Sequence, residues 1–121
     1  MLIVGIAIAG AAGALARYWV DAAVVRAVPR GLPAATLAIN VSGSFVLGVL
    51  TGLVLYHGLG STPRIVIGTG FCGGYTTFST FAYEVVFLAE QRRNRAALVN
   101  ALLSLALPAL VAGFGLALAS L

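Results

Sequence analysis

Hydrophobic residues fill four long stretches of the chain, and short polar or glycine-containing segments separate them. A helix needs about 20 consecutive apolar residues to cross a bilayer. Each stretch reaches that length, so the pattern predicts four transmembrane helices. We expect them at about residues 2–25, 33–56, 64–90 and 95–121.

The connections between these spans are short. Residues 26–32 and 57–63 contain Gly and Pro, and residues 90–95 form the charged run EQRRNR. Such compositions are typical of turns. We therefore predict an all-α integral membrane protein whose residues 1–121 form a single four-helix transmembrane domain.

Composition supports a membrane protein. Hydrophobic residues make up 61% of the chain and charged residues 8%. Soluble domains carry about 25% charged residues, and disordered chains combine low hydrophobicity with high net charge. Both classes are excluded, and a multi-pass protein of the cell membrane is expected. The single Cys72 and single His57 leave no Cys-based zinc site and no histidine cluster. We predict no enzyme activity, and interpret Cys72 as an apolar filler and His57 as solvated.

Arginine supplies all the positive side-chain charge, and the net charge is +4. The arginines are scattered between apolar runs, without the basic face of a nucleic-acid-binding protein. Positive residues instead set the orientation of membrane proteins. Five of them fall in the first and third connections and one lies near the second: Arg26, Arg30, Arg92, Arg93 and Arg95, against Arg64. This bias predicts cytoplasmic first and third connections, with both termini outside.

Small and polar residues recur every four positions in the first span, from Gly5 through Ala9 and Gly13 to Arg17 and Asp21. Residues at this spacing share one helix face, and small residues allow helices to pack closely. Arg17 has two interpretations: it belongs to a packing face, or its charge attracts an anion. A pair with Asp21 is possible in either case.

The second span has the same spacing in Thr36, Asn40, Ser44, Gly48 and Gly52. The two glycines predict a helix contact. The amide of Asn40 needs partners in a membrane. It either bonds another helix or donates its NH₂ group to an anion in a pore.

The fourth span carries Asn100, Ser104 and Pro108, again four residues apart. A mid-helix serine usually bonds the backbone carbonyl four residues earlier, here that of Asn100. Proline lacks an N–H, so Pro108 frees the carbonyl of Ser104. Polar stripes from two helices would line one narrow track.

The third span contains the run GTGFCGGYTTFSTF, residues 68–81. Glycine costs about 1 kcal/mol relative to alanine inside a helix, so this run predicts a break in the span. Non-helical backbone at membrane depth occurs where it is buried or lines a cavity, and its free carbonyls suit a hard cation. Phe78 and Phe81 share a face, and their electropositive ring edges suit an anion; ordinary packing is the alternative.

Three stretches resemble the CrcB (Fluc) fluoride channel family: GAAGALARYW (10–19), ATLAINVSGSFVLG (35–48) and GTGFCGGYTTFSTFAYE (68–84). The third is long and unusual, and the resemblance extends along essentially the whole chain. It implies an antiparallel dimer of four-helix subunits with two fluoride pores along the interface. It also implies a structural, non-transported Na⁺ at the dimer centre, held by backbone carbonyls that fall on Gly73 and Thr76.

The resemblance also assigns the residues of the pore. It places the pore phenylalanines on Phe78 and Phe81 and the pore asparagine on Asn40. Ser79 and Thr80 flank the phenylalanines, and Arg17 matches a basic residue of the first helix. Asn100 and Ser104 fall on a polar track of the fourth helix, where Pro108 replaces a small polar residue.

The physics of fluoride agrees with these positions. Fluoride is small and strongly hydrated, so a pore must replace its water with N–H, O–H and ring-edge donors. The three carboxylates, Asp21, Glu84 and Glu90, fall toward span ends. HF enters a cell as a neutral acid and ionises there, so a passive channel lowers toxicity by exporting F⁻. Four helices of one chain do not easily enclose a pore, which makes a dimer expected.

The arginine bias departs from the family, in which dual topology accompanies a balanced count. It suggests a fixed orientation, so the partner is either a second copy or an oppositely oriented homologue. Two other functions remain as alternatives. A small multidrug-type antiporter needs a carboxylate deep in the first span, where this chain has Arg17. A non-conducting scaffold does not need the costly run at residues 68–81.

Overall fold

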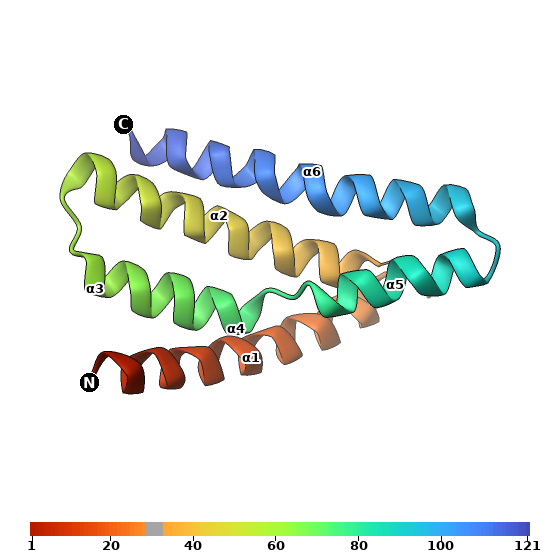
Figure 1. Ribbon diagram of the computed structural model, residues 1–121, viewed down its shortest axis with the longest axis horizontal. Coiled ribbons are helices and arrows are strands. Elements are labelled where there is room, and N and C mark those ends of the chain that lie inside the picture. Colours follow the sequence, from red (N-terminus) through yellow and green to blue (C-terminus); the bar gives the residue numbers. More distant parts are fainter. Residues whose placement is uncertain (29–32) are drawn as a thin grey trace.

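The computed structural model describes residues 1–28 and 33–121, whose regular structure is entirely helical (Figure 1). The elements are α1 (Leu2–Ala27), α2 (Ala34–His57), α3 (Ser61–Arg64), the π-helix η1 (Ile65–Cys72), α4 (Gly73–Tyr75), α5 (Ser79–Glu90) and α6 (Asn94–Ala119). The predicted all-α class is confirmed. Arg30 and most of the predicted first turn lie outside the described residues.

The described helices give the four expected passes. α1, α2 and α6 are each long and apolar enough to cross a membrane. The third pass is divided: α3, η1 and α4 follow one another, and α5 continues after a gap in the helix (Figure 1). The predicted bounds differ from the observed ones by a few residues, because helix ends depend on local capping that periodicity does not resolve.

The passes lie side by side, and different termini and turns lie at the two ends of the bundle (Figure 1). Both termini and the turn between α2 and α3 lie at one end; the end of α1, the start of α2 and the turn between α5 and α6 lie at the other. The second end therefore carries four of the described arginines: Arg26, Arg92, Arg93 and Arg95. The predicted orientation depends on this gathering of arginines at one end of the bundle.

α2 packs mainly against α6, and the two run in the same direction. A Cβ atom on Gly48 would collide with the carbonyl oxygen of Ala112, and one on Gly52 with the side chain of Ala119. The predicted helix contact at these glycines is confirmed. At the end of the pair, Nε2 of His57 lies 2.6 Å from the carbonyl oxygen of Ala119.

His57 is exposed, as predicted, but it also makes a hydrogen bond that the sequence did not predict. Its Nε2 donates to Ala119, because a carbonyl oxygen only accepts. The last carbonyls of a helix have no donor within that helix. Since α2 and α6 end side by side, the ring of His57 is in reach of one of them.

α1 packs against η1 and α4 through its small residues. A Cβ atom on Gly13 would collide with the carbonyl oxygen of Phe71, and one on Gly74 with the carbonyl oxygen of Gly10. The face that Gly5 and Gly13 share is thus a packing face. Gly74 is required by the close approach of α1 and lies within a helical segment.

Candidate functional site

The third pass loses its helical geometry at residues 76–78, which we call the break. α4 ends at Tyr75, Thr76 is extended (φ −77°, ψ 161°) and α5 begins at Ser79. The predicted interruption is confirmed, although it follows Gly73 and Gly74 rather than including them. Both glycines stay helical, and the partners taken by Thr77 explain where the helix stops.

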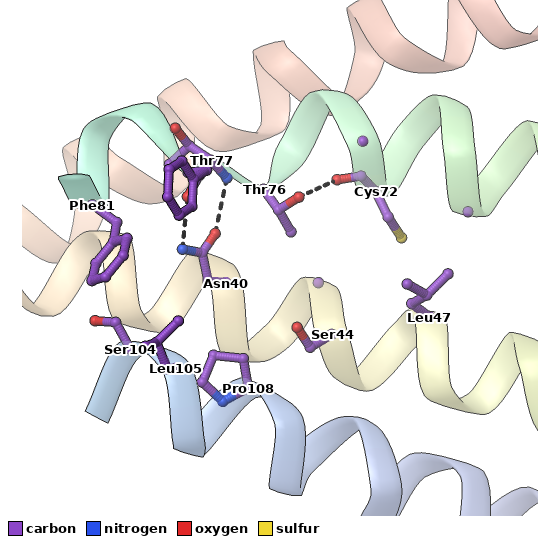
Figure 2. Close-up of a pocket in the computed structure, with 14 residues that line it drawn as sticks. Asn40, Ser44, Leu47, Cys72, Thr76, Thr77, Phe81, Ser104, Leu105 and Pro108 are labelled. Atoms are coloured by element: carbon purple, nitrogen blue, oxygen red, sulfur yellow. Dashed lines mark hydrogen bonds between the residues drawn. The ribbon is translucent and has the colours of Figure 1, made fainter. Parts of the chain in front are cut away.

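The amide of Asn40 binds both backbone groups of Thr77 (Figure 2). Nδ2 of Asn40 donates to the carbonyl oxygen of Thr77 at 2.9 Å, and the N–H of Thr77 donates to Oδ1 of Asn40, also at 2.9 Å. The N–H of Thr77 would bond the carbonyl of Gly73 if the helix continued. Of the two interpretations of Asn40, the bond to another helix is the one observed. One N–H of Nδ2 is used in this bond, and an amide nitrogen carries two.

The side chain of Thr77 begins the next helix. Its Oγ1 accepts the backbone N–H of Thr80 at 3.2 Å. Since Phe78 already has helical backbone angles (φ −93°, ψ −37°), this is the bond of an N-cap residue to the third residue of the helix. In a continuous helix that N–H would bond the carbonyl of Thr76. Thr77 is not among the predicted site residues, although a Thr directly before an apolar helical run is a known helix-start signal.

Asn40 and Thr77 thus accept the two N–H groups that a continuous helix would give to the carbonyls of Gly73 and Thr76. Unwound carbonyl oxygens are ligands that Na⁺ accepts. Within the described ranges, no group of three His, Cys, Asp or Glu side chains is placed to hold a metal. A cation at the break would thus depend on these carbonyls. Their chemistry fits a hard monovalent ion.

A hollow of about 330 Å³ lies between α2, the third pass and α6. Six of the predicted site residues line it: Asn40, Gly73, Thr76, Phe78, Phe81 and Ser104. Pro108 and Ser44 also line it (Figure 2). Among the described lining residues none is acidic. The hollow therefore combines apolar walls with N–H and O–H groups, as a site for a small anion requires.

The two phenylalanines differ in exposure. Phe78 is 74% exposed, whereas Phe81 is 9% exposed. Their ring centroids lie 5.6 Å apart at an interplanar angle of 64°, an edge-on arrangement. Ring edges carry partial positive charge. Phe81 is fixed by packing, while Phe78 projects from the single chain.

The polar residues of α6 bond each other. Oγ of Ser104 donates to Oδ1 of Asn100 at 3.0 Å, so the expected bond from Ser104 to the backbone carbonyl of Asn100 was wrong. The side-chain oxygen of Asn100 is reached from the same helix turn and competes with that carbonyl. Asn100 is buried, and its Nδ2 has no hydrogen-bond partner among the described residues. It lines a separate groove, together with Leu37 and Arg93.

Besides Asn100, three predicted residues lie outside the hollow: Arg17, Ser79 and Thr80. Arg17 and Thr80 line a separate depression together with Asp21, Thr36 and Thr77. Oγ of Ser79 lies 3.3 Å from Oγ1 of Thr77. Arg17 and Asp21 form no ion pair with each other in the described chain, so their suggested pairing is not observed. Thr77 borders both the hollow and this depression.

Glu84 contacts α2, which its place toward a span end did not suggest. Oγ1 of Thr36 donates to Oε1 of Glu84 at 2.7 Å, and Oε2 has no partner among the described residues. Thr36 is 4% exposed. The bond ties α5 to α2 on the far side of the break from α4.

Comparison with known proteins places the whole chain in one group. The family model described as CrcB-like protein, Camphor Resistance (CrcB), matches residues 4–116. A protein of Leifsonia xyli named fluoride-specific ion channel FluC 1 is 49% identical over all of this chain and 88% of its own length. A FluC protein of Syntrophotalea carbinolica is 46% identical over 98% of each chain. One from Methanocaldococcus jannaschii is 40% identical over 98% of this chain and 93% of its own.

Proposed function

This chain belongs to the CrcB-like protein family, and we propose on that basis that it is a fluoride-specific channel of the cell membrane. Two relatives that match this chain over 88% and 98% of their own lengths are named fluoride-specific ion channels. The observation that carries the proposal is the break, where Asn40, Phe78 and Phe81 meet at one hollow without an acidic lining residue. Fluoride leaving the cytoplasm would exchange water for the donors of this hollow.

Each donor class has a physical role. The free N–H of Asn40 and the hydroxyl of Ser104 replace hydration, and the edges of Phe78 and Phe81 contribute positive partial charge. Arg17, Ser79, Thr80 and Asn100 lie off the hollow and are proposed for the approach to it. A carboxylate in the hollow would repel the anion, and the described residues that line the hollow include none. Asp21 lies beside Arg17 in the depression outside it, and Glu84 is bonded to Thr36.

We also propose that Na⁺ is a structural ion of this channel. The carbonyls of Gly73 and Thr76 have lost their helical donors to Asn40 and Thr77, which supports the assignment. When bound, the ion would neutralise the oxygen dipoles that the break exposes. Two carbonyls are few for a hard cation, which takes several oxygen ligands, so a second subunit is expected to supply more.

A second subunit is supported by the surface around the break. Phe78 is 74% exposed, and a Cβ atom on Gly73 would meet nothing within 4 Å. The φ of Gly73 is −63°, an angle that any residue adopts. Neither a steric clash nor the backbone conformation of the single chain therefore requires a glycine at this position. We propose that an antiparallel partner packs there. The arginine bias favours an oppositely oriented homologue over a second copy.

Fluoride efflux from proteoliposomes tests the proposal. The chain is reconstituted alone and, in parallel, with a neighbouring homologue of opposite arginine bias, and chloride efflux is the control. Fast, fluoride-selective efflux from either preparation is expected. Efflux from the mixed preparation only would identify a heterodimer. A lack of selective efflux from both would overturn the channel assignment in favour of a scaffold.

A further inference from the structure

We infer that Asn40 is a positioning residue: its amide, bonded to both backbone groups of Thr77, holds the third pass open at residues 76–78. The inference deepens the proposed function, on which it rests for its flux and Na⁺ measurements only. The two bonds are referred to below as the Asn40 clamp. The clamp is a property of the second and third passes of one chain.

The amide of Asn40 is complementary to the backbone that it binds. Its oxygen accepts the N–H of Thr77 and its nitrogen donates to the carbonyl of Thr77, both at 2.9 Å (Figure 2). The same exchange of bonds joins paired residues of adjacent antiparallel strands. A non-helical residue at membrane depth lacks water as an alternative partner. Asn40 therefore satisfies the peptide groups that the break would otherwise leave unbonded.

An anion site alone does not explain an amide at this position. Fluoride requires a donor, and a hydroxyl supplies one without adding a carbonyl-type oxygen to the lining. Oδ1 of Asn40 would repel fluoride if it faced the hollow. It is instead bonded to the N–H of Thr77. The clamp gives both ends of the amide a role.

The clamp acts on both sides of the break. On one side it removes the donor that a continuous helix would give to the carbonyl of Gly73. On the other side, the carbonyl of Thr77 belongs to the peptide bond that joins Phe78. Fixing the N–H and the carbonyl of Thr77 thus fixes the planes of both adjoining peptides. The side chain of Asn40 therefore determines the direction in which Phe78 leaves the backbone. It also leaves the carbonyl oxygen of Gly73 without its helical donor.

Ser42 provides a matched control on the same helix. Its Oγ bonds the hydroxyl of Tyr75 at 2.9 Å, so Ser42→Ala also removes a bond between α2 and the third pass. That bond reaches a side chain in α4 rather than the backbone of the break. Ser42 does not line the hollow.

The test measures amide hydrogen exchange at Thr77 by NMR in reconstituted protein, in Na⁺ buffer without fluoride. Asn40→Ala is expected to speed exchange at Thr77 by roughly tenfold or more, since both bonds are lost. Ser42→Ala is expected to leave exchange at Thr77 unchanged. The Na⁺ concentration that half-protects residues 76–78 is expected to rise in Asn40→Ala only. Unchanged exchange at Thr77 in a folded Asn40→Ala protein would overturn the inference.

A second measurement needs no variant. Wild-type protein labelled with ¹³C and ¹⁵N is expected to show a through-space correlation between the Thr77 nitrogen and Cγ of Asn40. Its absence, with the neighbouring contact between Thr76 and Cys72 detected, would overturn the inference even if Asn40→Ala fails to fold. Fluoride flux is recorded on the same preparation. A protected Thr77 in a wild-type protein without flux would retain the clamp and reject the channel.

Discussion

Thr77 shows how much of the site depends on one residue. Its backbone is bound by Asn40, and its hydroxyl oxygen accepts the N–H of Thr80. These bonds end one helix and begin the next. They also leave the carbonyls of Gly73 and Thr76 without helical donors. The hydroxyl and the backbone of Thr77 act separately, so a substitution can remove one and keep the other.

Thr77→Val is expected to remove the cap of α5 while preserving the Asn40 clamp. Valine has nearly the same shape but no oxygen, so stability should fall by about 1 kcal/mol. The freed N–H of Thr80 then returns to the carbonyl of Thr76, and Na⁺ protection should weaken. Thermal unfolding in detergent at several Na⁺ concentrations measures both effects. Thr69→Val, at an exposed position of η1, is the control; an equal loss in that variant would contradict the assignment.

The phenylalanines are expected to separate conduction from stability. Phe78→Leu should sharply reduce fluoride efflux, because the ring edge is lost, with little change in thermal stability, because the side chain is 74% exposed. Phe81→Leu should reduce efflux and also lower stability by about 1 kcal/mol, because Phe81 is 9% exposed. Efflux from proteoliposomes and unfolding of the same samples test the pair. Wild-type efflux in Phe78→Leu would remove Phe78 from the pathway.

At the scale of elements, periodicity sufficed for the four passes but not for the detail of the third. The apolar runs predicted α1, α2 and α6 because crossing a bilayer imposes a length and a composition. The run at residues 68–81 predicted an interruption, and the structure places it at residues 76–78, after the glycines. Gly74 is required by contact with α1, and the helix ends only where Thr77 finds partners. Those partners come from α2, 37 residues away in sequence, which no local pattern reveals.

The glycines of α2 offer a test of helix packing. Gly48→Ala places a Cβ against the carbonyl oxygen of Ala112, and backbone cannot move aside cheaply. A loss of about 1–3 kcal/mol is expected. The matched variant is Gly113→Ala in α6, where a Cβ meets nothing within 4 Å and alanine should gain up to about 1 kcal/mol. Thermal unfolding of both variants tests this prediction. Equal losses of stability would show that Gly48 is no more constrained than Gly113.

At the scale of the whole molecule, the two ends of the bundle carry unequal charge. The first and third connections hold five arginines in sequence, and one, Arg64, lies near the second. The structure places four of those five at a single end, with Arg30 outside the described residues. Positive residues are retained on the cytoplasmic side during insertion. A chain inserted in one orientation only cannot form an antiparallel pair with itself.

Redistributing this charge is therefore expected to change the partner. Replacing Arg92, Arg93 and Arg95 by Gln leaves Arg26 and Arg30 against Arg64, two to one instead of five to one. A reporter fused to the carboxyl terminus should show wild-type chains mainly with that terminus outside, and the triple variant in both orientations. Fluoride efflux by the chain alone should then appear or increase, because opposed copies become available. The three side chains do not line the hollow, but Arg93 shares a groove with Asn100. Arg93→Gln alone is therefore the control for a direct effect on conduction, and an effect of the triple variant beyond that of this control would act through orientation. Both orientations in wild-type protein, with full efflux and no partner, would instead establish a homodimer and show that the arginine count does not fix this topology.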